Sequence, residues 1–408
     1  MVRAIGAFLD FCYLVRRSVI DEETLDAIDD AVIRFQRDRA IFHDVGIHPA
    51  GLSLPRQHSM IHYRHLIEQF GAPNGICSSI TESKHIKAVK EPWRRSSRYD
   101  ALGQMLVTNQ RLDKLAASRA DFAARGMLKG PCLPSYAQAE QIPDEVHNDD
   151  GDNGPIPGPR VLAHVTLAKC NGMGCSFVSP NDADLLHPAR GYPRNINALA
   201  IKINQPNFVE LVRRFLYDQL YPVATLSASE VSIAQCPDFR GRVKIFHSAV
   251  ANYFAPSDCS GVGGMHHERI RAVPSWRNGA ARNDCVFAEK DANLEGFCGL
   301  YVLRTLNFFS FHYRGVFYPC ALVEWFTTLG DEPCRDTGMW KVKPDLQEDG
   351  QRVTSVVHLD CILRGAHLIG VYGDNFLPRY FHFSESLLSF QAYFVNKFAD
   401  HHANTIAF

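Results

Sequence analysis

Apolar side chains recur at helical spacing through the first third of the chain. Ile5, Phe8 and Cys12 lie on one face of a predicted helix, and Asp21 is placed to cap the next one. Proline near the start of a segment and glycine just after its end mark further helix boundaries. The pattern predicts helices over residues 4–17, 21–46, 55–71 and 97–125. Residues 1–128 are therefore predicted to be all helical.

The helical spacing of apolar side chains stops after this region. Residues 129–160 are rich in proline, glycine and acid, and they have no apolar periodicity that would offset the entropy of ordering the chain. The acidic run from Asp149 to Asp152 lacks the later glutamate that a calcium loop requires. We interpret residues 129–160 as an acidic linker.

Beyond the linker, apolar side chains tend to recur at every second residue, which is typical of strands. Residues 161–168 form a short strand candidate. Runs rich in Val, Ile, Phe and Tyr then lie between turn residues at 229–235, 242–254, 283–289, 299–312, 316–327, 338–343 and 353–363. Helices are predicted near 206–220 and 385–398. The prediction is an α+β protein: a helical region, the linker, then a β-rich antiparallel barrel or sandwich-like domain over 161–408 with a C-terminal helix.

Composition narrows the class of protein. The hydrophobic content of 46% is that of a globular chain, and no apolar run is long enough to cross a membrane. Asp10 and two arginines interrupt the N-terminal apolar stretch, so it does not have the pattern of a signal peptide. The 12 cysteines are scattered, which favours free thiols over a disulfide framework. These features predict an intracellular protein that is neither secreted nor bound in a membrane.

Positive charge is concentrated in one segment of a chain that is otherwise balanced. The chain has 43 basic and 44 acidic side chains, yet residues 81–102 hold six bases against three acids. Pro92 lacks an N–H and must break or restart the helix there, which predicts a bent basic ridge. A ridge of this kind is either a solvated helix face or a surface that contacts phosphates. Its bases are Lys84, Lys87, Lys90, Arg94, Arg95 and Arg98.

A second group of cations surrounds a tryptophan in the β-rich part. Trp276 and Arg277 follow Arg269 and Arg271 and precede Arg282. We interpret these five residues as a second surface for a polyanion or a protein partner. Trp325 and Trp340 lie within apolar runs and are predicted to be core residues.

The remaining chemical candidates are weaker than these. His58, His62 and His65 share a helical face but lack a fourth metal ligand, so packing between helices is the better interpretation. Cys259 with His266 or His267 has no assignable orienting group, which disfavours a thiol protease. The doublet His401-His402 is predicted to interact with a helix-end dipole. The chain also lacks a Walker loop, a dinucleotide turn, a nucleophile elbow and a paired-histidine zinc helix.

Several motifs in collinear order resemble the C-terminal half of Plavaka-type transposases, members of the Kyakuja-Dileera-Zisupton superfamily that are frequent in mushroom-forming fungi. The resemblance covers nearly the whole chain. It is carried by FLDFCYLVRR (8–17), SLPRQHSMIHY (53–63), FGAPNGICSSITESKHIKAVKEPWRRSSRYDAL (70–102), NQRLDKLAA (109–117), FLYDQ (215–219), APSDCSGVGGM (255–265), YPCALVEWF (318–326), DTGMWKVKPD (336–345), AHLIGVYG (366–373) and VNKFADHHA (395–403).

The resemblance implies a nuclear enzyme with an RNase-H-like core, in which three carboxylates hold two Mg²⁺ or Mn²⁺ ions for DNA cleavage and transfer. Glu82 is the candidate for the third carboxylate, and it also completes a capping box with Ser79, so it is either a cap alone or a metal ligand that also caps. The first two acids of the family lie upstream of anything that resembles this chain. We therefore expect a fragment that is catalytically incomplete in isolation, needs no cofactor there, and retains contact with the DNA backbone.

An alternative from another class stays open at this point. The β-rich domain can instead belong to a domesticated module that recognises a protein or chromatin partner and does not bind DNA. A degenerate gene fragment without a selected function is a third interpretation.

Overall fold

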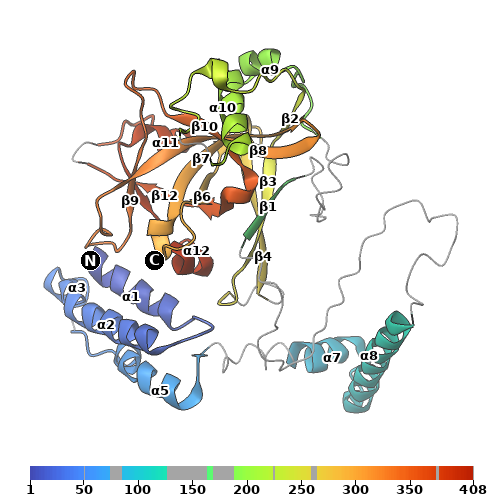
Figure 1. Ribbon diagram of the computed structural model, residues 1–408. Helices are drawn as coiled ribbons and strands as arrows, with labels where there is room; N and C mark the ends of the chain where they lie inside the picture. Colours follow the sequence, from blue (N-terminus) through green and yellow to red (C-terminus); the bar gives the residue numbers. More distant parts are fainter. Residues whose placement is uncertain are drawn as a thin grey trace. The chain divides into compact units, whose positions relative to one another are not determined.

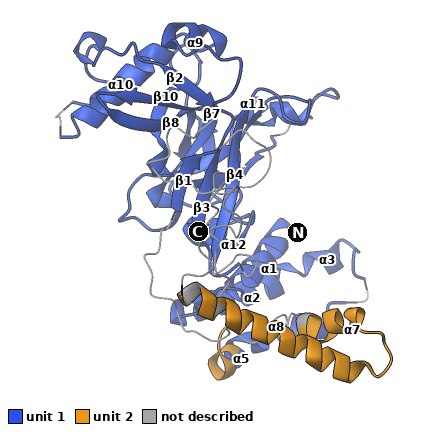
Figure 2. Cartoon of the chain, turned by 90° about the vertical axis from the view of Figure 1, so that its right-hand side faces the viewer, with its two compact units in different colours: residues 1–66, 158–408 blue, residues 67–157 orange. Residues whose placement is uncertain are grey.

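The computed structural model describes residues 1–49, 51–73, 85–125, 163–168, 188–223, 226–258, 264–373 and 376–407. The chain forms two compact units, one made of Met1–Leu66 with Gly158–Phe408 and the other of Ile67–Pro157 (Figure 2). The predicted linker at 129–160 lies outside the described residues. The first 66 residues thus share a unit with the β-rich part of the chain.

The N-terminal helices begin and end close to the predicted positions. Asp21 caps α2 by accepting a hydrogen bond from the backbone N–H of Thr24 at 2.8 Å. Pro55 opens the next helical stretch, as its fixed φ favours. The elements are α1 (Val2–Leu14), α2 (Glu22–Asp38), α3 (Ile41–Asp44), α4 (Pro55–His58), the 3-10 turn η1 (Ser59–His62) and α5 (Tyr63–Phe70).

The second unit contains a short helix that changes from π to α type, followed by a long α-helix. The π-helical turn η3 (Ile86–Lys90) runs into α7 (Glu91–Arg95), and α8 (Ala101–Ala124) follows. The change of helix type lies between Lys90 and Glu91, just before Pro92, and the backbone stays helical through the proline to Arg95 instead of breaking there.

The β-rich part consists of antiparallel strands in two sheets that form a nearly closed, barrel-like structure (Figure 1). The smaller sheet has the order β1-β3-β4-β5, and the larger has β11-β6-β7-β8-β9-β13-β12, with β10 on β8 and β2 on β7. The strands are β1 (Ala163–Leu167), β2 (Val243–Phe246), β3 (Ser248–Phe254), β4 (Met265–Val273), β5 (Arg282–Asn283), β6 (Cys285–Glu289), β7 (Leu300–Tyr313), β8 (Val316–Leu329), β9 (Lys341–Pro344), β10 (Thr354–His358), β11 (Ile362–Ala366), β12 (Leu368–Gly370) and β13 (Tyr393–Val395). The α+β fold class is confirmed.

A β-bulge changes which positions of the long strand β7 face the core between the two sheets. The register with β8 shifts between Thr305 and Asn307, so the parity of inward-facing positions changes there. Leu303 before the shift and Phe308 after it both enter the core between the two sheets. Phe309 faces the other way, into the core beneath α9 (Ile196–Lys202) and α10 (Phe208–Leu220).

Two predicted elements are wrong. Residues 229–235 form no strand, because Ser232 and Gln235 make a reciprocal capping box around the 3-10 turn η6 (Ile233–Gln235). The helix predicted over 385–398 is replaced by η9 (Phe383–Glu385), α11 (Ser386–Ser389) and then β13, where alternate side chains are buried. Phe390 has extended backbone angles, which end the helix after one turn. The C-terminal helix is α12 (His401–Ala407).

The first helix packs against the C-terminal segment of the same unit. Tyr13 donates a hydrogen bond from its hydroxyl to the carbonyl of Phe398 at 2.9 Å. The Nζ of Lys397 lies 2.7 Å from a carboxylate oxygen of Asp10, and both side chains are largely buried. The exposed pair Arg3–Asp336 extends this contact. The N-terminal helices are therefore joined to the β-rich part by ion pairs and a hydrogen bond. The turns η7 (Gly296–Gly299) and η8 (Leu359–Cys361) complete the described elements.

Candidate nucleic-acid interface

The predicted basic ridge is described in part. Glu82 and Lys84 lie outside the described residues, and Lys87 is described only by its backbone, within η3. The side chains of Lys90, Arg94, Arg95 and Arg98 are exposed. None of these four forms an ion pair with another residue in the described part of the chain.

The local backbone explains how these cations are presented. Lys90 and Arg94 lie one helical turn apart, and Arg95 ends α7. The chain then leaves the helix at Ser96 with extended angles, and Arg98 has a positive φ of 64°. The side-chain amide of Asn109 donates to the carbonyl of Ala88 at 2.8 Å, which joins η3 to α8. The described bases therefore lie on a helical segment that continues through Pro92 and ends at Ser96, and on the turn that follows it.

The second predicted group is assembled by a hairpin in the β-rich unit. β4 and β5 pair through Val273 and Arg282, and the loop between them contains a tight turn. Arg277 and Asn278 both have positive φ, and the N–H of Gly279 donates to the carbonyl of Trp276 at 2.9 Å, which defines a type I′ turn. The turn reverses the direction of the chain. Arginines before and after the turn in the sequence therefore reach the indole of Trp276.

Three guanidinium groups surround that indole. Their Cζ atoms lie 4.4 Å, 5.4 Å and 5.3 Å from the ring centroid for Arg271, Arg277 and Arg282 respectively. Arg277 is exposed and Trp276 is half-buried. We name Arg269, Arg271, Trp276, Arg277 and Arg282 the arginine–tryptophan cluster. The structure brings together the five residues that the sequence singled out.

The cluster carries an excess of positive charge. The pKa of Arg271 is lowered, first by partial burial and then by the charge of Arg282, with Arg269 and Arg277 adding to it. Asp284 opposes this effect, but its carboxylate already binds the guanidinium of Arg282 at 2.7 Å and accepts from the backbone N–H of Arg271. Mutual repulsion between neighbouring guanidiniums is relieved when an anion binds among them, so the cluster is suited to phosphate.

Sequence reasoning missed a smaller cationic pocket. It has a volume of about 260 Å³ and lies between the segment before α9 and strand β2. Arg190, Arg194 and Lys244 line it, and no acid does. Some fifty residues of chain separate the two segments, so no local pattern could have indicated that these cations meet.

Sequence reasoning also missed a buried ionic network at the start of α12. The side chain of Arg364 is 4% exposed and makes two hydrogen bonds to Asp400, at 2.7 Å and 2.5 Å. Its guanidinium also lies over the ring of Tyr253, and His402 stacks on that ring at 4.4 Å. Burial raises the pKa of Tyr253 to about 12. The network connects β11, β3 and α12, and we interpret it as structural.

The histidine doublet does not have the predicted role. His401 and His402 begin α12, whereas a cation interacts favourably with the other end of a helix. Burial, and then the charge of Arg364, lower the pKa of His402 to about 4, so its ring is neutral at pH 7. Trp340 is buried as predicted, and Trp325 is half-buried with its indole N–H donating to Ser355.

The described ranges contain neither a candidate metal site nor a helix that could span a membrane. No group of three or more His, Cys, Asp or Glu side chains is arranged there to hold a metal ion. None of the helices described is both long and apolar enough to span a bilayer. Comparison of the chain with models of known protein families, with curated proteins and with solved structures gives no match.

Proposed function

We propose that this chain is a DNA-binding portion of a transposase-like protein, that it acts in the nucleus, and that it holds the phosphate backbone without cleaving it. The resemblance of its collinear motifs to Plavaka-type transposases supports the family. The arginine–tryptophan cluster supports the binding, because three guanidiniums lie around one indole ring and Arg269 adds a further positive charge beside Arg271, with Asp284 as the acid among them.

The geometry favours phosphate contact over base-specific recognition. Guanidinium groups present forked donors that match phosphate oxygens, and they need no particular base. An aromatic ring among cations also suits unpaired bases, which stack on any flat surface. Duplex DNA is the expected ligand, and binding of single strands alone would point to stacking on Trp276 instead.

The basic ridge is the second proposed contact surface. Its described cations are exposed and lie on a short helical segment and the turn after it, which suits contact with several phosphates. Glu82, the one carboxylate that the resemblance assigns to this chain, lies outside the described residues. The proposed function is therefore binding alone, with no step that involves Mg²⁺ or Mn²⁺.

Fluorescence anisotropy with a labelled duplex, repeated over a series of salt concentrations, tests the proposal. Each phosphate contact contributes about 0.9 to the slope of log K against log salt concentration. The double variant Arg271→Gln/Arg277→Gln is expected to lower that slope by about 2, and Arg94→Gln/Arg95→Gln by a similar amount. Arg335→Gln is the matched control, since Arg335 is also exposed but lies outside both groups.

Three results would contradict the proposal. Absence of binding at low salt would remove the DNA-binding function. An equal slope in the wild type and both double variants would show that binding occurs elsewhere. Nicking of supercoiled DNA with Mg²⁺ or Mn²⁺, lost in Glu82→Ala, would show that the chain cleaves DNA.

A further inference from the structure

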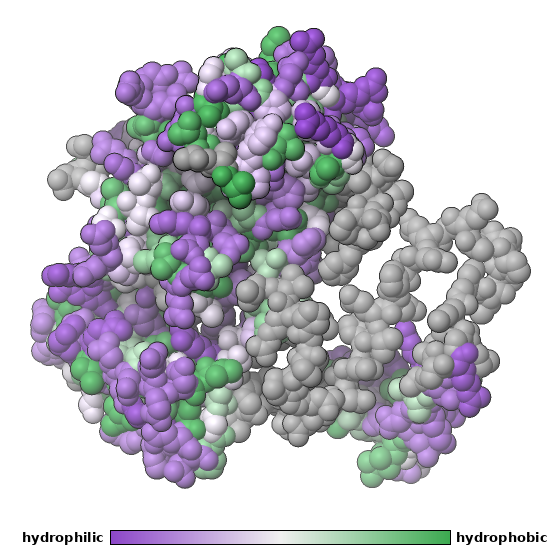
Figure 3. Space-filling view, viewed as in Figure 1, coloured by the Kyte–Doolittle hydropathy of each residue, from purple (hydrophilic) through white to green (hydrophobic). Residues whose placement is uncertain are grey.

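An open groove lies between α1, α2 and the segment from Leu52 to Tyr63. It has a volume of about 560 Å³, within the range of ligand-binding clefts. Phe8 and Ile5 face it from α1 and remain 41% and 51% exposed. Apolar side chains also reach the surface among hydrophilic ones over the N-terminal helices in Figure 3. Apolar surface of this kind is typical of an interaction site.

The wall of the groove is apolar. Phe8 packs on Phe35 with ring centroids 5.4 Å apart, and Phe11 meets Tyr63 edge to face at 5.1 Å. These contacts fix the aromatic side chains, so the groove is preformed. The other apolar lining residues are Ile5, Cys12, Val15, Phe42, Leu52 and Met60.

The rim of the groove is cationic. Arg16, Arg39 and Arg56 line it, and none of its fifteen lining residues is Asp or Glu. Arg39 donates a hydrogen bond to the side-chain oxygen of Gln57, which holds its guanidinium in place. Neither Arg39 nor Arg56 forms an ion pair with a residue in the described ranges. The groove therefore combines an apolar surface with positive charge that a partner can neutralise.

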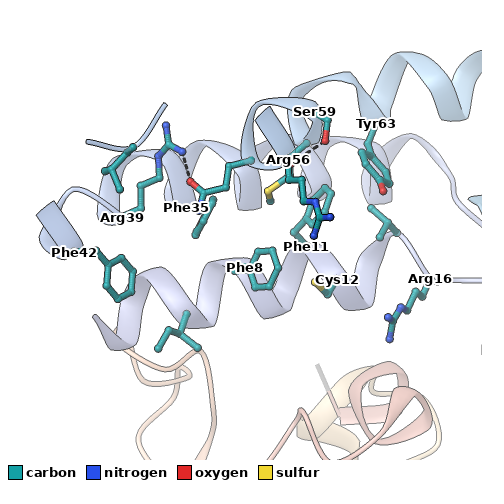
Figure 4. A pocket seen from close by; sticks show the side chains of 15 residues that line it. Phe8, Phe11, Cys12, Arg16, Phe35, Arg39, Phe42, Arg56, Ser59 and Tyr63 are labelled. Carbon is teal, nitrogen blue, oxygen red and sulfur yellow. Dashed lines mark hydrogen bonds between the residues drawn. The ribbon is translucent and has the colours of Figure 1, made fainter. Parts of the chain in front are cut away.

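The distribution of charge indicates the shape of that partner. In Figure 4, Arg39 lies near Phe42 at one end, Arg56 points towards α1 near the middle, and Arg16 lies at the other end. Lining residues run from Ile5 on α1 to Arg16, just after the end of this helix, a distance of about 16 Å at the rise of an α-helix. A ligand with a single acidic head, such as a fatty acid, would need cations at only one end of the groove. Cations along the whole length match a partner with acids along its length.

We propose that this groove binds an acidic amphipathic α-helix of a partner protein. The apolar face of that helix, with side chains at i, i+3, i+4 and i+7, lies on Phe8 and its neighbours. Flanking Glu or Asp side chains pair with Arg39 and Arg56. This protein-binding site is separate from the proposed DNA contacts and does not depend on them.

A designed peptide is the probe for this site. It has 14 residues, with Leu at the i, i+3, i+4 and i+7 positions and Glu or Ala elsewhere, and carries a fluorescent label. We expect saturable binding by anisotropy, weakened at least about tenfold in Arg56→Glu, which corresponds to about 1.4 kcal/mol. Because Arg56 is exposed, this variant is expected to fold normally. Phe8→Glu should weaken binding as well, with its fold checked by thermal denaturation.

Matched controls distinguish binding in the groove from nonspecific binding to the protein. Ile33→Glu adds the same charge on α2 at a position that is 64% exposed and outside the groove, so it should bind the peptide as the wild type does. A peptide with Lys in place of Glu should not bind. The proposal is overturned if the acidic peptide does not bind, if Arg56→Glu binds it equally well, or if laurate occupies the groove and the peptide does not. It is also overturned if sedimentation shows a dimer that Phe8→Glu dissociates.

Discussion

Acidification is expected to destabilise the protein through His402, which lies against a buried cation. Its Nδ1 is 3.3 Å from the guanidinium of Arg364, whose side chain is 4% exposed. Burial, and then the charge of Arg364, lower the pKa of His402 from 6.5 to about 4, while Asp400 opposes the shift. Protonation of His402 in the folded protein would place a second positive charge beside Arg364.

The sign and size of the effect follow from the two pKa values. Between pH 6.5 and pH 4 the unfolded chain binds a proton at this histidine and the folded protein does not, so stability falls as the pH falls. The contribution is complete above pH 6.5 and is lost towards pH 4. From pH 7 to pH 4.5 the loss amounts to about 2.5 kcal/mol.

Asp400 titrates in a lower range and does not obscure this effect. Burial alone would raise its pKa, but the hydrogen bonds and charge of Arg364 outweigh burial and hold the pKa below its usual 3.8. The stability that Asp400 contributes is therefore present above pH 3.8 and is lost only below it. His401 also has a pKa lowered by burial, so it adds a decline of the same sign.

Urea denaturation followed by tryptophan fluorescence, at steps from pH 7 to pH 4.5, measures the free energy of unfolding. His402→Phe keeps a ring against Tyr253 but cannot bind a proton, so its curve should be flatter than the wild-type curve by about 2.5 kcal/mol over this range. His43→Gln, at an exposed position, is the control and should leave the curve unchanged. Equal declines in the wild type and His402→Phe would refute the reasoning, as would a wild-type curve that falls only below pH 4.

Two further predictions concern the β-rich core. Phe308→Ala removes a fully buried ring and should lower the free energy of unfolding by about 3–5 kcal/mol, whereas Phe383→Ala at a 76% exposed position should change it by less than about 0.5 kcal/mol in the same denaturation assay. Gly299→Ala would place a Cβ atom 2.3 Å from the carbonyl oxygen of Leu294 and should cost about 1–3 kcal/mol in thermal unfolding. Gly373→Ala meets nothing within 4 Å and should be nearly neutral; equal effects in the two glycine variants would contradict the packing argument.

Local chemistry explains which elements could be predicted. The cap at Asp21, the proline at residue 55 and the strands predicted at 283–289, 299–312 and 316–327 depend on neighbours in sequence, and the structure has them. Strand β4 was not predicted, because its residues MHHERIRAV are mostly polar and half-buried. The helix predicted over residues 385–398 was wrong because the closely spaced aromatic residues of this segment are compatible with a helix as well as with a strand. Pairing of Tyr393 with Val342 on β9 decides in favour of the strand.

The sequence by itself determined the α+β class, the positions of most helices and strands, and the presence of two groups of basic residues. These depend on periodicity, capping and local charge, which act over a few residues. Only the tertiary structure decided that three guanidiniums surround Trp276, that His402 lies beside Arg364, and that α1 and α2 form a groove with a cationic rim. The residues of the groove and of the His402–Arg364 contact come from different helices and strands, and the arginines around Trp276 come from two paired strands and the turn between them, so their meeting depends on strand pairing and helix packing. No local pattern encodes those distances.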